Sequence, residues 1–264
     1  MKHISFSTSD IPSAHEIAIS RIFNEGDDFQ VGHGSEEVWT KKLSVDIEIL
    51  HPETRPLLGT YCPNDEKYLM EYFVRYLWGI DNLPHWGKQP DEHYTYASRM
   101  REPVNQIQIA IDRIVKNPAD RQIRIMIARP EDINEFAPWI DGQQVLDDEG
   151  KPAKWEPPCL TYIDFDIDMK DRTINLDCYF RSWDCLAGFP VNLAGLQLFN
   201  EQIVSDVNEK IDAYNFLHPQ NMRGIFKTGK IIGRSKNLHL YARQIKMLKE
   251  REFKHVEDSR RMVK

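Results

Sequence analysis

Two neighbouring segments near the middle of the chain alternate hydrophobic and polar residues. Residues 163–168 place three aspartates after Ile163, Phe165 and Ile167, and residues 174–180 resume the alternation after a short polar turn. A period of two predicts strands that bury one face. Because the turn is short, we expect the two strands to form an antiparallel hairpin.

Other segments carry helical and strand patterns of their own. Apolar residues at helical spacing, with a polar cap before them and a glycine or proline after them, predict helices, and further alternating runs predict strands. We expect helices over residues 10–25, 65–78, 103–116 and from about 192, and strands over 43–49, 123–129 and 237–241. Residues 137–155 are acidic and irregular, and residues 206–235 show no clear period. The length and the pattern predict a single α/β domain over residues 1–264.

The turn of the hairpin sets which residues face one another. If Lys170 faces Thr173, the register brings Cys159 beside the segment from Arg181 to Asp184. The hairpin therefore predicts a thiol close to an arginine, a serine and an aspartate.

This neighbourhood suits a nucleophile beside an anion site. A nearby guanidinium keeps more of a thiol in its nucleophilic thiolate form. Arg181 also presents a planar fork that matches phosphate, with the Ser182 hydroxyl beside it. The helix expected from about Asn192 would point its positive end toward the same strand ends. Taken singly, Cys159 is typical of a buried small residue and Asn192 of a helix cap. Their combination favours the functional interpretation.

Composition and charge narrow the possible classes. The chain is 41% hydrophobic and 28% charged, which is typical of a soluble globular protein. Its net charge of −7 argues against general nucleic-acid binding. The cysteines form no CxxC pair and no metal-ligand spacing, and no apolar segment of signal or transmembrane length is present. We therefore expect a cytoplasmic protein with reduced thiols and no metal.

The stretch PPC…FRSWDCLAGFPVN resembles the thymidylate synthases and their relatives, the pyrimidine-nucleotide hydroxymethylases. In that family a Pro-Cys carries the nucleophile, an Arg-Ser-x-Asp follows one hairpin later, and a Gly-x-Pro-x-Asn ends the segment. The resemblance implies a mixed twisted sheet covered by helices, which dimerises through the sheet. It also implies a pyrimidine deoxynucleotide monophosphate as substrate, 5,10-methylenetetrahydrofolate as co-substrate, and no metal.

The resemblance assigns the reacting thiol and the phosphate contacts. Cys159 would attack C6 of the pyrimidine, while Arg181 would stabilise the thiolate. Arg181 and Ser182 would also hold the phosphate. A partner chain would add Arg121, because Asp120-Arg121-Gln122 resembles the family's Ser-Arg-Arg.

Three further residues would read the base and the sugar. Asn192 can donate to O4 and accept from N3–H, a pairing that suits uracil better than cytosine. His239 and Tyr241 match the family's His-x-Tyr, which hydrogen-bonds the sugar hydroxyl. Without the resemblance, residues so spaced on a strand are simply neighbours on one face.

Four residues complete the expected site. By resemblance, Asp184 and Gly188 would contact the folate, Glu71 would organise proton movement, and Tyr96 would lie near the thiol. Ala97 stands where the family usually has glycine. The pattern alone places Glu71 off the apolar stripe of its helix and allows Tyr96 to be a half-buried strand tyrosine.

The sequence departs from the family at several positions. The loop over residues 30–40 lacks the family's phosphate arginine, Gln122 replaces a second arginine, and Leu160 replaces the common histidine after the cysteine. The last residues, RRMVK, are poorly suited to sealing a folate site. An open site favours capture of water, giving 5-hydroxymethyl-dUMP, over hydride transfer, giving thymidylate.

Two other classes of protein remain open. A cysteine hydrolase could use His239 as its base, but no glycine-rich oxyanion loop adjoins Cys159. A non-catalytic nucleotide-binding relative would agree with the reduced number of phosphate contacts.

Overall fold

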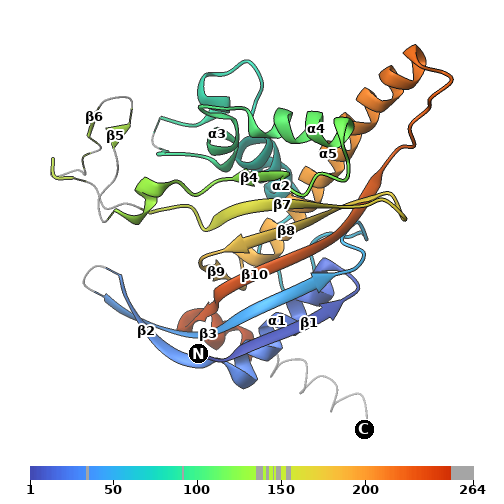
Figure 1. Ribbon diagram of the computed structural model, residues 1–264. Helices are drawn as coiled ribbons and strands as arrows, with labels where there is room; N and C mark the ends of the chain where they lie inside the picture. Colours follow the sequence, from blue (N-terminus) through green and yellow to red (C-terminus); the bar gives the residue numbers. More distant parts are fainter. Residues whose placement is uncertain are drawn as a thin grey trace, which may run out of the picture.

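The computed structural model is built on one mixed sheet of eight strands (Figure 1). The structure describes residues 1–33, 36–90, 92–134, 139–140, 143–144, 146, 150–152 and 156–250. The strands lie in the order β1-β3-β10-β8-β7-β4, with β2 beside β3 and β9 beside β10. Their bounds are β1 His3–Thr8, β2 Asp27–His33, β3 Glu36–Ile49, β4 Arg124–Met126, β7 Leu160–Asp168, β8 Thr173–Phe180, β9 Trp183–Asp184 and β10 Lys227–Tyr241.

Helices connect these strands. Their bounds are α1 Ile11–Glu25, α2 Glu66–Glu71, the π-helix η1 Tyr72–Trp78, the short helix η2 Pro84–Gly87, α3 Tyr96–Arg101, α4 Gln106–Lys116, η3 Pro130–Ile133 and α5 Gly188–Leu217. A separate small ladder joins β5 Trp139–Ile140 to β6 Gln143–Gln144. The helices expected near residues 10–25 and 103–116 are confirmed, and the one expected over 65–78 consists of α2 followed by η1.

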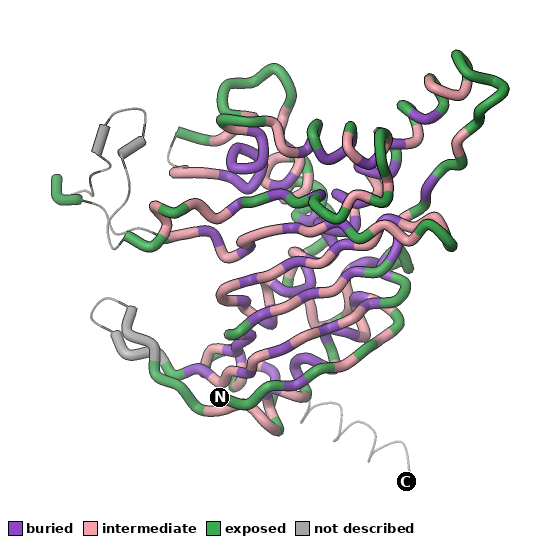
Figure 2. Tube along the Cα trace, viewed as in Figure 1, coloured by how far each residue is buried: buried purple, intermediate pink, exposed green. Residues whose placement is uncertain are grey.

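One face of the sheet carries the hydrophobic core and the helices. α1 packs against β3, α5 packs against β10 and β8, and α4 packs against α5 and β4. Burial alternates along the central strands, as the period of two in the sequence requires (Figure 2). The largest fully buried side chains are aromatic: Trp183, Phe180, Phe189 and Phe199.

The opposite face of the sheet is polar. It carries ion pairs between neighbouring strands: Arg124–Asp164, Arg234–Asp177 and Lys230–Glu48. None of the described helices lies over this face (Figure 1). Exposed pairs of this kind contribute little to stability. The dimer expected through the sheet stays a prediction.

The β7–β8 hairpin is present, but its register differs from the expected one. Asp168 pairs with Thr173, so residues 169–172 form the loop and Lys170 does not face Thr173. The Asp168 carboxylate accepts hydrogen bonds from the amides of Lys170 at 2.8 Å and Asp171 at 3.0 Å. These hydrogen bonds satisfy the backbone amides of the loop. The chain can therefore reverse over residues 169–172 instead of over a tighter turn.

Two helix boundaries also differ from the sequence pattern. α5 begins at Gly188 rather than near Asn192, and Pro190 fits its first turn because amides there need no helical partner. Tyr96 opens a helix and not a strand, because Thr95 and Ser98 form a capping box that starts α3.

The expected α/β fold, with a mixed sheet covered by helices, is thus confirmed. Assignment of residues 1–264 to one domain stays a prediction. Within the ranges described above, no helix is long and apolar enough to span a membrane.

Candidate active site

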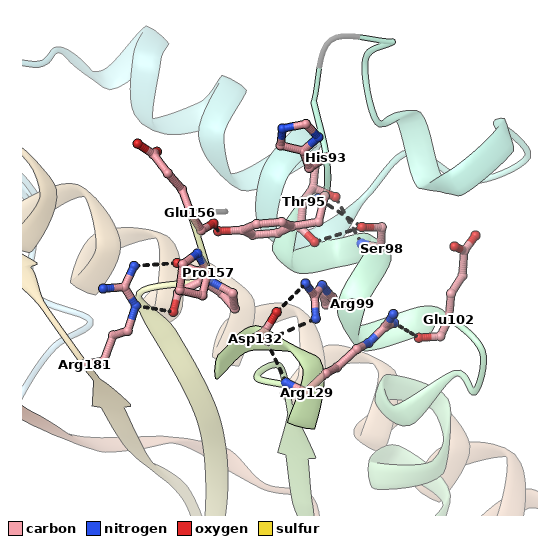
Figure 3. A network of polar contacts seen from close by, with 12 residues as sticks. His93, Thr95, Ser98, Arg99, Glu102, Arg129, Asp132, Glu156, Pro157 and Arg181 are labelled. Carbon is pink, nitrogen blue, oxygen red and sulfur yellow. Dashed lines mark hydrogen bonds and ion pairs between the residues drawn. The ribbon is translucent and has the colours of Figure 1, made fainter. Parts of the chain in front are cut away.

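Cys159 immediately precedes β7, after a segment whose carbonyl groups are each held by a side chain. The Tyr94 hydroxyl donates to the carbonyl of Glu156 at 3.3 Å. Arg181 donates to the carbonyls of the two prolines before Cys159, through Nη2 at 2.6 Å and through Nε at 3.1 Å (Figure 3). Three consecutive carbonyls are therefore fixed, and the position of the cysteine is fixed with them.

The backbone on either side of the thiol is also tied down. The amide of Arg181 donates to the carbonyl of Cys159 at 2.8 Å, and the amide of Leu160 donates to the Tyr96 hydroxyl at 3.3 Å. An irregularity in pairing between Leu160 and Tyr162 makes this register possible. Cys159 consequently lies opposite Arg181 itself, at one end of the segment expected from the sequence.

The helix that positions Tyr96 is anchored by a buried ion pair. Arg99 binds Asp132 through two nitrogens, at 2.8 and 3.2 Å, and both side chains are almost fully buried. Asp132 also accepts from the amide of Arg129 at 2.7 Å (Figure 3). Bidentate arginine–carboxylate geometry gives directional support, so α3 is held against η3.

The Cys159 thiol is not activated in the free protein. Burial raises its pKa above the usual value, the nearby Arg181 lowers it, and Glu156 raises it. The net direction is upward, so the thiol form predominates at neutral pH. Arg181 lowers the pKa of Cys159, but burial outweighs this effect in the free protein. Stabilisation of the reacting thiolate by Arg181 stays a prediction.

A wall of tyrosines lies near the thiol, and it consists of Tyr72, Tyr76, Tyr94 and Tyr96. Tyr72 stacks on Tyr76 at 5.7 Å between ring centroids, Tyr76 meets Tyr96 edge-on at 4.9 Å, and Tyr94 lies 6.4 Å from Tyr96. Burial raises the pKa of all four phenols, that of Tyr76 to about 12, and negative charge on Cys159 would raise each further. These hydroxyls remain protonated and can act as neutral donors.

Asn192 lies in the first turn of α5 with its amide orientation determined. The indole Nε1–H of Trp183 donates to Oδ1 at 3.0 Å, and Nδ2 donates to the Tyr72 hydroxyl at 2.8 Å. Because an indole only donates, the oxygen of the amide must face Trp183. Asn192 retains one further donor and one further acceptor position.

A second group of polar side chains lies on β10 and the start of β9. The Ser182 hydroxyl accepts from Asn237 Nδ2 at 3.2 Å, and Asn237 Oδ1 is buried with no hydrogen-bond partner among the described residues. His239 Nδ1 donates to the carbonyl of Asn237 at 3.2 Å. The rings of His239 and Tyr241 meet edge-on at 5.0 Å. An unpaired buried acceptor is costly, which is consistent with a ligand donor at this position.

Asp184 connects the turn before α5 to Gln244, which follows β10. Its carboxylate accepts from the amides of Leu186 and Ala187, at 2.9 and 3.3 Å, and from Gln244 Nε2 at 3.1 Å. Among the residues that the structure describes, Gln244 alone hydrogen-bonds to Oδ2, so that oxygen can accept another N–H group, as a pterin edge would offer. This acceptor position fits the N–H edge of the pterin ring of a folate. At Gly188, an added Cβ would make only ordinary contacts, so packing does not require glycine there.

Two expected site residues are exposed. Glu71 is one of them, whereas Tyr72, the next residue, contacts Asn192. Arg121 is exposed in the loop before β4. Antiparallel pairing places Arg124 opposite Asp164, so Arg121 lies at the end of β4 remote from Cys159. At about 3.3 Å per residue, this separation is on the order of 25 Å along the strands.

The sequence pattern did not reveal several residues that the fold brings to this site. Tyr72 and Tyr76 are four residues apart and fit an apolar helix stripe, so their hydroxyls gave no signal. Asn237 lies two residues before His239 of the His-x-Tyr motif, and Gln244 lies three residues after Tyr241. Among the described residues, no group of three or more metal-binding side chains is present.

Comparison with solved structures defines the class of fold. The chain superposes on the thermostable thymidylate synthase A from Bacillus subtilis with a TM-score of 0.60, covering 91% of this chain and 83% of that one, at 14% identity. The sequence model of the family "Thymidylate synthase" matches residues 78–262. The chain belongs to the thymidylate synthase family.

The curated relatives match this chain over only part of their length. A protein named "Putative thymidylate synthase" from Methanococcoides burtonii is 29% identical over 140 residues, covering 49% of this chain and 55% of the relative. A protein of the same name from Methanosarcina barkeri is 29% identical over 146 residues, covering 50% and 57%. The chain thus spans somewhat more than half the length of the curated relatives it matches. The family expected from the sequence is confirmed.

Proposed function

We propose that this protein transfers a one-carbon unit to C5 of a pyrimidine deoxynucleotide monophosphate, with dUMP as the preferred substrate. The observation that carries the proposal is the fixed Cys159, with Arg181 bound to its backbone and Asn192 oriented at the start of α5. When bound, 5,10-methylenetetrahydrofolate supplies the one-carbon unit at the methylene level.

Each residue then has a defined task. Cys159 adds to C6 as the covalent catalyst. Arg181 has one guanidinium nitrogen, Nη1, that is not used on the prolines, and it can meet a phosphate together with Ser182. His239 and Tyr241 offer ring groups to the sugar, and Asp184 offers Oδ2 to the folate. Arg121 completes the phosphate site from a second subunit of a homodimer.

We further propose that the product is the 5-hydroxymethyl nucleotide. Support comes from the wall of tyrosines, whose hydroxyls can retain water beside the thiol. The last residues of the chain, which raised this possibility in the sequence, lie outside the described residues. Thymidylate is the competing product, and it is favoured by the names of the curated relatives.

The decisive experiment is mass spectrometry of the product formed from dUMP or dCMP with methylenetetrahydrofolate in ¹⁸O-labelled water. A labelled hydroxymethyl-dUMP supports the proposal. An unlabelled methyl product with dihydrofolate released makes the protein a thymidylate synthase. Cys159→Ala provides the blank, and equal rates on dUMP and dCMP would contradict the base preference.

A further inference from the structure

The hydroxyl of Tyr72 is held against Asn192 with its own proton unused. Asn192 Nδ2 donates to the phenol oxygen at 2.8 Å. A nitrogen that donates cannot accept, so the phenol proton must point elsewhere. Among the described residues, no hydrogen bond takes up that proton, although the phenol is buried enough for its pKa to be raised. The O–H of Tyr72 is thus available to a bound molecule.

Two features of the fold place Tyr72 at this position. Tyr72 begins the π-helix η1, and π-helical turns often occur at functional sites. Opposite it on α5 is Gly195, where an added Cβ would lie 2.8 Å from the Tyr72 ring and 2.7 Å from Leu77. Glycine at 195 therefore lets η1 approach α5 closely enough for the phenol to reach Asn192, one turn earlier on the helix.

The electrostatic state of the phenol suits donation and not proton abstraction. Burial raises the pKa of Tyr72 well above that of a free phenol, and negative charge on Cys159 would raise it further. Tyr72 therefore stays neutral while a thiolate is present. Glu71, the neighbouring carboxylate, is exposed, and the hydrogen bonds of Asn192 within the described residues go to Trp183 and Tyr72.

We infer that Tyr72 is a catalytic hydrogen-bond donor to the C4 oxygen of the pyrimidine, acting beside Asn192. The inference rests on the proposed function. In the addition step, the sulfur electron pair of the Cys159 thiolate forms the S–C6 bond. The C5=C6 π pair moves to C4–C5, and the C4=O4 π pair becomes a lone pair on O4. Tyr72 keeps its proton throughout and stabilises the negative oxygen.

The test uses hydrogen exchange at C5 of dUMP, which reports enolate formation without any folate. Tyr72→Phe keeps the ring and removes only the hydroxyl. Loss of one preorganised donor to an oxyanion lowers rates by about 10²–10³-fold. We expect that loss in C5 exchange at saturating dUMP and in the turnover number, with the dUMP dissociation constant changed less than about tenfold. Tyr68→Phe removes the hydroxyl of an exposed tyrosine on α2, so it is the matched control and should exchange at nearly the parent rate.

A second measurement separates donation from a purely structural role. With 4-thio-dUMP, whose sulfur is a weaker acceptor, the parent should exchange more slowly than with dUMP. Tyr72→Phe should lose most of that discrimination. Parent-like exchange in Tyr72→Phe would overturn the inference while leaving the proposed function intact, as would unchanged discrimination. Absence of both dUMP binding and exchange in the parent protein would overturn the proposed function and this inference together.

Discussion

The main-chain amide of Arg181 donates to the carbonyl of Cys159 at 2.8 Å, while the guanidinium of the same residue binds the two preceding carbonyls. One residue thereby holds the segment that contains Cys159 by both its backbone and its side chain. The arrangement requires the irregular pairing before Tyr162. It places a positive charge next to the thiol, but this charge does not offset the effect of burial on the pKa of Cys159.

Replacing the thiol should abolish turnover. Cys159→Ser is expected to lower the rate by several orders of magnitude, because an alkoxide is much harder to form than a thiolate. The parent should form a covalent complex with 5-fluoro-dUMP, visible as a mass shift on the peptide that contains Cys159. Cys62→Ser is the matched control, since Cys62 is another free, half-buried thiol. Full activity in Cys159→Ser would contradict the assignment.

Reactivity of the free enzyme should increase toward high pH. The pKa of Cys159 is raised by burial, so thiolate appears only as the pH rises through a value above the usual one. Alkylation of Cys159 by iodoacetamide, followed on its peptide, should therefore rise with pH. Arg181→Met removes the charge that lowers this pKa and should move the profile to still higher pH. A parent midpoint below the usual thiol value of 9.0 would refute this prediction.

Arg121 should act only from a second subunit. It is exposed at the end of β4 remote from the thiol of its own chain, and a two-fold interface would repeat its contribution in both sites. Mixing inactive Cys159→Ala chains with inactive Arg121→Ala chains should restore activity, because one site of each heterodimer is intact. Arg113→Ala, which changes a nearby arginine paired with Asp120, is the control. No recovery despite demonstrated subunit exchange would count against the prediction.

His15 should make the fold sensitive to acid. Its side chain is fully buried, and the backbone of Cys185 and Leu186 beside the ring only partly offsets the effect of that burial on its pKa. Burial lowers its pKa from 6.5 to about 4. The unfolded chain therefore binds the proton first, so stability is complete above pH 6.5 and falls between pH 6.5 and about 4. The loss from this group is roughly 3 kcal/mol at most.

Urea unfolding at several pH values measures this loss. His15→Phe preserves an aromatic ring against Phe189 and should unfold with a smaller pH dependence over this window than the parent. His218→Asn, which changes an exposed histidine, should retain the parental dependence. An identical pH dependence in His15→Phe and the parent would contradict the prediction.

Much of the fold was predictable because its signals are local. The alternation in β7 and β8 and the polar cap of α1 follow from neighbouring residues, and the structure contains them. The register was not predictable, because the Asp168 carboxylate satisfies the loop amides and permits a longer turn. Tyr96 was ambiguous for a similar reason, since the capping box that starts its helix depends on residues on either side of it.

The sequence by itself determined the family motif, the order of Cys159, Arg181 and Asn192, and the periodic burial of the strands, because each depends on residue type and spacing along the chain. The tertiary structure decided what faces the thiol. It brought Tyr72 to Asn192 across the gap left by Gly195, left Glu71 in solvent, and buried Cys159 enough to raise its pKa. These outcomes depend on contacts between segments remote in sequence, and periodicity along one segment carries no information about its distant neighbours.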